Sequence, residues 1–453
     1  MDKEKKFFGL TKDKLISYNT ISLLASIAVG ILIFSPVPIA IYGCFRKSVN
    51  IIQSRYVVLM QNALFPLVCV FAFILYILIL MRIKKYNTRL ADILLKNPLI
   101  IVFSIVVLLI IVSQAYNGLG YALDGFLELT LGESFDVEVG YFIFFLFAAT
   151  QVRKEKHKRV LLRGHLLSSA FIVFTGFILW NAKVGTDEVY YIQGGGFTSI
   201  YYNSNYYGYY LATSVPLAAA AFLYEKKLLW KVIAGASFVA NTVALSINNC
   251  TGGWVGAALG MIFIVVTHII VEKKVNYQSL ILVLVFAVAL YIPGHILGTF
   301  EDNLFSLGSD ITKIASGDED AGAAGSGRWD IWKGTLGVIN EHKLFGIGFE
   351  GVYYDMPKYH VAAGNLRPHN EFLQYALFHG IPMMIMYFIG CLGVFIRALK
   401  KKKMMDGATL VCLSAAFGYL VSSFFGLTVY STAFYLFVFL GMGYVHETTD
   451  AEE

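Results

Sequence analysis

A polar cluster stands directly before an apolar run in the last third of the sequence. Residues 367–380 read RPHNEFLQYALFHG, so Arg367, His369, Asn370 and Glu371 precede aromatic and aliphatic side chains. A guanidinium group takes two phosphate oxygens at once. An imidazole ring, with an unperturbed pKa near 6.5, exchanges protons at neutral pH. These residue types suit anion binding and proton transfer.

A second candidate segment lies upstream and reads RWDIWKGTLGVINEHKLFGIGFEG. Its apolar residues recur at helical spacing, which predicts a short amphipathic helix against the membrane surface or the top of a helix bundle. The tryptophans are expected to hold Arg328 in the first turn of this helix. The residues on its expected apolar face are Trp329, Trp332, Leu336 and Ile339.

Proline is favoured at the first position of a helix, so Pro368 is expected to start a helix that His369 and the next residues open. The first turn of a helix carries unpaired N–H groups and about half a positive charge. Residues 368–372 therefore predict an anion-binding cap. Gly380 and Pro382 are expected to end or kink this helix.

Three roles for the polar residues of the cap stay open. His369 accepts a proton from a hydroxyl, donates a hydrogen bond to phosphate, or merely caps a helix. Glu371 positions His369, binds sugar hydroxyls, or only complements the helix dipole.

The elements that position these residues must lie in a membrane. The chain has 57% hydrophobic and 15% charged residues and a mean hydropathy of +0.65, outside the range of soluble domains. Stretches such as residues 98–116 supply close to the roughly 20 apolar residues that a bilayer core demands. The sequence therefore predicts an all-α polytopic membrane protein with about twelve spans. These are expected at 21–44, 57–81, 98–116, 137–152, 161–181, 205–224, 229–249, 252–271, 278–297, 378–398, 408–426 and 430–446.

Lysine and arginine gather in alternate loops, as the positive-inside rule requires of cytoplasmic segments. This pattern predicts cytoplasmic termini and accounts for the net charge of +6 without a nucleic-acid partner. We expect three regions: spans one to nine at 1–297, a large extracytoplasmic loop with short helices at 298–377, and the last three spans with a tail at 378–453. No cleavable signal peptide is expected.

The long loop contains a Gly, Ala, Ser and acid-rich stretch at 306–327, which is expected to be mobile. Two motifs in this loop are interpreted as coincidental. The GxGxxG match at 346–351 has no βαβ unit around it, and Asp318 to Asp320 form a solvated acidic loop. The five cysteines show no CxxC pairing, so neither a disulfide framework nor a zinc site is expected.

A tyrosine-rich segment at 188–210 has two interpretations. The rings form an interfacial aromatic belt, or they stack on sugar faces while Asn203 and Asn205 bind hydroxyl groups. Both can hold.

Three segments together resemble the O-antigen ligase and O-antigen polymerase superfamily of bacterial membrane glycosyltransferases. They are NSNYYGYYLATSVPL at 203–217, the Arg-Trp segment at 327–352, and RPHNEFLQYALFHGIP at 367–382. With topology, the likeness covers most of residues 200–445, whereas the first two hundred residues match only as a hydropathy pattern.

The resemblance implies a GT-C-like enzyme in the cytoplasmic (inner) membrane. Such an enzyme moves a glycan from undecaprenyl pyrophosphate to an acceptor hydroxyl on a glycan or glycolipid at the outer face, without metal, cofactor or nucleotide sugar. His369 matches the essential histidine of the family, and Arg328 matches the arginine that opens the Arg-Trp helix. Arg367 lies in a matching loop. A further family arginine is expected where this chain has Thr251.

A competing hypothesis is a polytopic transporter of an organic anion or lipid-linked sugar. Ligase and polymerase activities share the same donor chemistry, so the sequence leaves them open, together with the sugar, the stereochemical outcome and the oligomeric state.

Overall fold

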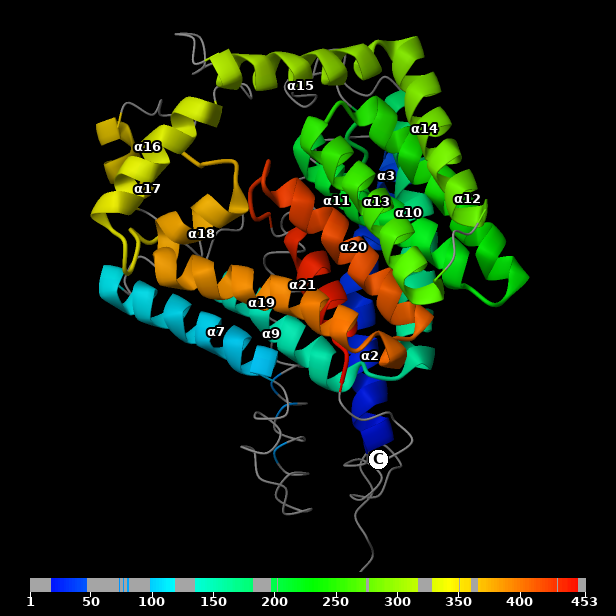
Figure 1. The fold of residues 1–453 in the computed structure, drawn as a ribbon, viewed down its shortest axis with the longest axis horizontal. Coiled ribbons are helices and arrows are strands. Elements are labelled where there is room, and N and C mark those ends of the chain that lie inside the picture. Colours follow the sequence, from blue (N-terminus) through cyan, green and yellow to red (C-terminus); the bar gives the residue numbers. More distant parts are fainter. Residues whose placement is uncertain are drawn as a thin grey trace, which may run out of the picture.

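The computed structural model of the chain is helical throughout the part that it describes, and no strand occurs there (Figure 1). The described residues are 18–46, 73, 76, 80, 98–118, 135–181, 197–201, 203–273, 277–316, 328–349, 351–359, 366–429 and 431–446.

A central group of helices surrounds α11, whose residues are buried from Tyr207 to Ala221. Small side chains allow the backbones of this group to approach closely. A Cβ on Gly418 would lie 2.1 Å from the carbonyl oxygen of Ala212 in α11, so helix contact here depends on the missing side chain. The group comprises α11 (Ser204–Tyr224), α12 (Leu228–Asn248), α13 (Thr251–Glu272) and α20 (Gly407–Ser423).

A second group continues the same apolar core and packs against α12 and α20. Aromatic rings fill it, and those of Tyr141 and Phe437 stack with centroids 5.3 Å apart. The turn at Ser35 separates its first two helices. The group comprises α2 (Tyr18–Phe34), α3 (Pro36–Arg46), α9 (Phe135–Gln151), α10 (Glu155–Asn181) and α21 (Ala433–Met442).

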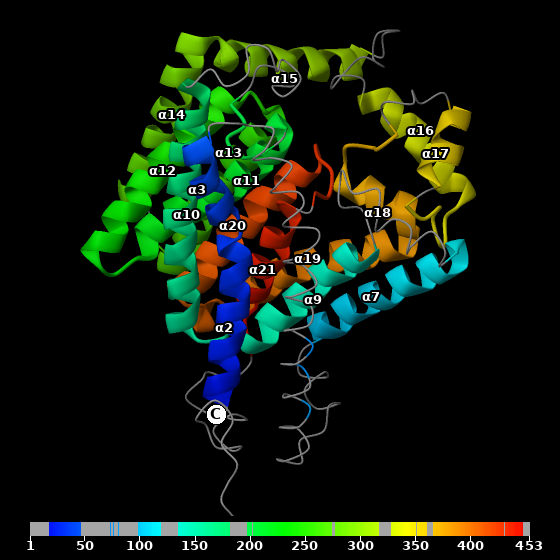
Figure 2. The same cartoon turned by 180° about the vertical axis from the view of Figure 1, so that it is seen from behind.

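Three further helices expose apolar side chains, as lipid-facing helices do. On α14, Leu284 is 64% exposed and Ile296 is 75% exposed. Figures 1 and 2 show α7 and α19 side by side along one flank and α14 at the opposite flank. These helices are α7 (Pro98–Asn117), α14 (Tyr277–Leu297) and α19 (Ile381–Lys400).

Seven helices among the described residues are long and apolar enough to cross a membrane, which confirms a polytopic all-α membrane protein. The expected count of twelve is not established. The expected spans at 137–152, 408–426 and 430–446 are shorter apolar helices, and most of the expected span at 57–81 lies outside the described residues.

The elements between α14 and α19 in the chain lie outside these groups, and α15 runs from α14 toward α16 (Figures 1 and 2). Part of the stretch expected to be mobile is thus helical through Ser316, and the rest, with the acidic motif at 318–320, lies outside the described residues. The elements are α15 (Thr299–Ser316), α16 (Arg328–Glu341), α17 (Val352–Asp355), the 3-10 helix Met356–Tyr359 and α18 (Glu371–His379). A further 3-10 helix, Lys402–Met404, follows α19.

The turn after α16 packs backbone to backbone against the junction of α18 and α19. Gly346 and Gly380 have φ of +63° and +88°. A Cβ on Gly380 would lie 2.2 Å from the carbonyl oxygen of Leu344. The expected break at Gly380 is therefore confirmed, with Pro382 in the first turn of α19.

Replacing Gly380 with alanine should destabilise the protein by about 2 kcal/mol or more, through left-handed backbone strain and overpacking. Gly308→Ala in α15 is the matched control, since its added Cβ meets nothing within 4 Å, and alanine is the better helix former by about 1 kcal/mol. Apparent melting temperatures in detergent measure both effects. Equal melting temperatures for Gly380→Ala and the parent protein would contradict the packing argument.

Candidate functional site

Helix α16 begins at Arg328 and buries one face against the neighbouring short helices. Its buried residues are Ile331, Gly334, Thr335, Val338 and Ile339, which recur every three or four positions as on an amphipathic helix. The expected helix is thus confirmed. On its expected apolar face, Ile339 is buried and Leu336 is 54% exposed. The two tryptophan rings next to Arg328 lie with centroids 6.3 Å apart.

The helix expected to start at Pro368 starts at Glu371 instead. His369 has a φ of +48° and Asn370 is extended, so neither residue can continue a helix backward toward Pro368. The side chain of Asn370 caps the helix by accepting a hydrogen bond from the N–H of Leu373 at 3.1 Å. The expected cap at 368–372 is therefore wrong in its first residues. The helix start is formed by Asn370 and the residues that follow it.

Contacts at both ends hold α16 beside α18. In the first turn of α16, Nε1 of Trp332 donates to the carbonyl oxygen of Pro368 at 2.7 Å. At the other end, the N–H groups of Ile347 and Gly348 donate to the last carbonyls of α18 at 2.9 and 3.0 Å. As a result, Arg328 and His369 lie at the same end of this helix pair.

The charge of Arg328 affects the pKa of His369. Burial, and to a smaller degree the neighbouring Arg328 cation, together lower the pKa of His369 from 6.5 to about 4. The imidazole is therefore neutral at physiological pH, as a proton acceptor must be. The ring is only partly buried, and so is Arg328.

The beginnings of α11 and α13 complete the surroundings of Arg328. The Tyr209 hydroxyl and the Cys250 thiol both lie within electrostatic range of the guanidinium. The Cys250 thiol also donates to Oδ1 of Asn205 at 3.4 Å. Asn203 caps α11, accepting from the N–H of Asn205 at 2.7 Å. The two asparagines predicted to bind sugar thus lie in the segment that faces Arg328.

Arg367 contacts an aromatic ring of α17. Its guanidinium lies over the ring of Tyr353 in α17, 5.2 Å from the centroid. This contact holds Arg367 against α17, whereas Arg328 and His369 lie at the shared start of α16 and α18.

Glu371 lies inside the bundle, with an exposed fraction of 0%. Its Oε1 accepts from the Tyr387 hydroxyl at 2.6 Å, and Tyr419 also faces the carboxyl group. Burial raises the pKa of Glu371 to about 7. The carboxyl group therefore contacts α19 and α20 inside the bundle.

The polar residues of α18 form one buried stripe: Glu371, Gln374 and His379 are all 1% exposed or less. Oε1 of Gln374 accepts from the N–H of Thr428 at 3.2 Å, and His379 contacts Glu138 of α9. Sequence inspection missed Glu138 and His379. Both are ionisable residues within otherwise apolar segments, and that pattern alone could have marked them as functional candidates.

Thr251, where the family arginine is expected, serves as a neutral link. Its hydroxyl donates to Oδ1 of Asn303 at 2.7 Å, and Nδ2 of Asn303 donates to Oδ1 of Asn249 at 2.8 Å. Asn303 belongs to α15 and is 1% exposed. The position therefore ties α15 to the start of α13.

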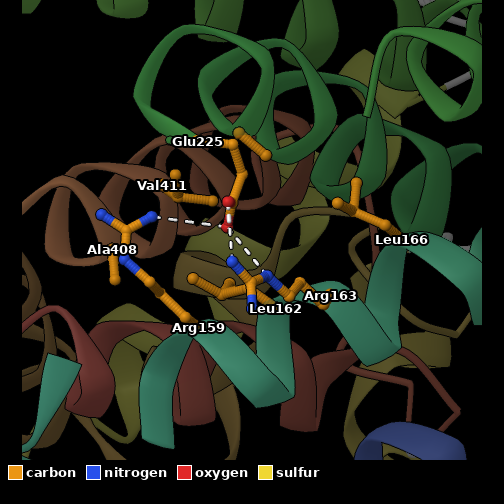
Figure 3. Close-up of a pocket in the computed structure, with 8 residues that line it drawn as sticks. Arg159, Leu162, Arg163, Leu166, Glu225, Ala408 and Val411 are labelled. Carbon is orange, nitrogen blue, oxygen red and sulfur yellow. Dashed lines mark hydrogen bonds and ion pairs between the residues drawn. The ribbon is translucent and has the colours of Figure 1, made fainter. Parts of the chain in front are cut away.

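A small cavity lies at the C-terminal end of α11, away from the start of that helix. Figure 3 shows Arg159 and Arg163 pointing toward Glu225 in it. The Arg163 to Glu225 distance is 2.8 Å, and these two arginines lower the pKa of Glu225. Both arginines are thus committed to a structural ion-pair network.

Within the described residues, no group of three or more His, Cys, Asp or Glu side chains is arranged to hold a metal ion. The chemistry available at the site is that of a neutral imidazole beside a guanidinium.

Because the pKa of Glu371 rises from 4.5 to about 7 on folding, its contribution to stability is complete below pH 4.5 and is lost as pH rises through 7. Glu371→Gln should retain the hydrogen bond from Tyr387. Between pH 5 and pH 8, the free energy of unfolding of this variant should fall by about 2–3 kcal/mol less than that of the parent protein. Melting curves at both pH values test this, with Glu341→Gln on the exposed end of α16 as the control. An unchanged pH dependence would contradict the buried acid.

A protein-family model described as O-antigen ligase matches residues 236–388, from the middle of α12 to the first half of α19. The matched region contains Arg328 and His369. No curated protein matches the chain. The family match confirms that this polytopic membrane protein resembles the O-antigen ligase and O-antigen polymerase superfamily.

Proposed function

We propose that the chain is a membrane glycosyltransferase that moves a glycan from an undecaprenyl-pyrophosphate donor to an acceptor hydroxyl at the outer face of the cytoplasmic membrane. The observation that carries this proposal is the meeting of Arg328 and His369 at one end of the α16 and α18 pair. The O-antigen ligase match over the same residues supports a glycan-transferring enzyme.

In the proposed reaction, the acceptor hydroxyl oxygen forms a bond to the anomeric carbon of the donor while the bond from that carbon to the pyrophosphate oxygen breaks. His369 takes the hydroxyl proton, and the bonding electrons leave with the lipid pyrophosphate. Fixed cations stabilise charge that develops on a leaving group. Arg328 supplies this charge, and Trp329 and Trp332 hold its helix start.

Asn203, Asn205 and Asn370 are proposed to bind the donor sugar or phosphate, because their helix starts surround Arg328 or carry His369. With Thr251 in place of an arginine, Arg328 carries more of the phosphate charge here than a two-arginine site would require.

His369→Ala and Arg328→Ala should each lower glycan transfer by about 100-fold or more, since a general base and a donor to a developing oxyanion are each typically worth that much. Proteoliposomes supplied with a lipid-pyrophosphate oligosaccharide and an acceptor glycan measure the new glycosidic bond by mass spectrometry. The matched controls are His342→Ala and Lys343→Ala, which remove a histidine and an exposed cation from the same loop.

Full transfer by both His369→Ala and Arg328→Ala would reject the site. Movement of solute across a sealed bilayer without any new glycosidic bond would instead favour the transporter hypothesis.

The acidic limb of the transfer rate should lie near pH 4 rather than near pH 6.5, because His369 loses its proton-accepting form only below its lowered pKa of about 4. In Arg328→Gln, the residual rate should begin to fall at higher pH, since one of the two causes of the lowered pKa is removed. Rates from pH 4 to pH 8 test both statements. A half-maximal rate at pH 6.5 in the parent protein would refute the neutral, shielded histidine.

A further inference from the structure

The last residue of α18 connects this helix to α7, a candidate membrane span, and to the shorter apolar helix α9. His379 is 1% exposed. Its Nε2 lies 2.5 Å from Oε2 of Glu138 in α9, and its Nδ1 lies 3.3 Å from Oγ of Ser113 in α7. The residues described above near Arg328 belong to α11 and the start of α13. These contacts therefore hold the end of α18 in place.

The hydrogen bonds around His379 define a net-neutral pair. The Ser113 hydroxyl donates its single hydrogen to the carbonyl oxygen of Phe345 at 2.6 Å or to that of Phe378 at 3.2 Å, so its oxygen accepts from Nδ1. A second hydrogen lies between Nε2 and Oε2 of Glu138, whereas Oε1 of Glu138 is buried without a hydrogen-bond partner among the described residues. Loss of either partner therefore leaves the other as an uncompensated buried group.

The same contacts reach the turn that follows α16. The carbonyl oxygen of Phe345 accepts from Ser113 and, at 3.1 Å, from Nδ2 of Asn117. The N–H of Ile381 donates to the carbonyl oxygen of Lys343 at 2.8 Å. The end of α18 and the turn at 343–348 are consequently fixed together on α7 and α9.

We propose that Glu138 and His379 are positioning residues for glycan transfer. They fasten the shared end of α16 and α18 to the membrane-spanning bundle, and this holds Arg328 and His369, at the opposite end of the same two helices, at their working separation. The inference rests on the proposed function for its effect on rate. Misplacement of a reacting group by about 1 Å can cost on the order of 100-fold.

Hydrogen exchange tests the fastening without any glycan donor. Glu138→Gln and His379→Gln preserve size, and each should speed exchange of the Ile347, Gly348 and Ile381 amides by about tenfold or more, since a tenfold change needs only a small loss of local stability. The measurement is mass spectrometry of peptides that cover 343–348 and 381, in lipid nanodiscs. Unchanged exchange in both variants would overturn the proposal, whether or not the protein transfers glycan.

Transfer assays test the effect on rate. Each single variant should lower kcat on the order of 10-fold to 100-fold with KM for the donor within about twofold, because the binding groups remain while their alignment is lost. The double variant Glu138→Gln with His379→Gln should recover part of both losses, since no lone buried charge remains. If the loss of kcat in the double variant equals the product of the two single losses, the proposed pairing of Glu138 with His379 is rejected.

His165→Gln is the matched control, because His165 is a fully buried histidine that contacts Ser214 at 3.0 Å on the other side of the bundle. It should leave exchange at 343–348 unchanged. Equal acceleration by His165→Gln would mean that any buried histidine loosens the turn, and would overturn the proposal. Absence of transfer in the parent protein would reject the proposed function alone.

Discussion

The buried polar stripe of α18 is the constraint on which the site depends. Glu371, Gln374 and His379 face the bundle, where Tyr387, the N–H of Thr428 and Glu138 receive them. Desolvated polar groups are costly unless they are paired. Because each partner comes from a different segment, α18 has one orientation that satisfies all three residues, and that orientation places Asn370 and His369 at its start.

The second helix of the site is fixed relative to the first by backbone contacts. Gly346 and Gly380 have positive φ, and no side chain separates the turn after α16 from the end of α18. Trp332 closes the other end through Pro368. Two short helices that would be marginal alone thus form one unit, since helices of this length gain most of their stability from tertiary packing.

Arg328 and His369 differ in charge. Arginine side chains in proteins are charged, and His369 is kept neutral by burial and by the neighbouring Arg328. The two roles proposed for them, a cation for phosphate and a neutral acceptor for a proton, are therefore compatible in one site. Thr251 and Asn303 add no charge to this region, and serve to attach α15 above the start of α13.

The sequence alone determined the all-α membrane class, most helix positions, the helix that opens at Arg328, and the break at Gly380, because composition, periodicity and glycine act locally. It misplaced the start of α18, since Pro368 favours a helix start while the left-handed His369 forbids one. Only the tertiary structure brought Arg328 to His369, turned Glu371 inward, and paired Glu138 with His379, which lie 241 positions apart. Such pairing depends on which helices pack together, and that follows from the complementarity of whole surfaces rather than from any local pattern.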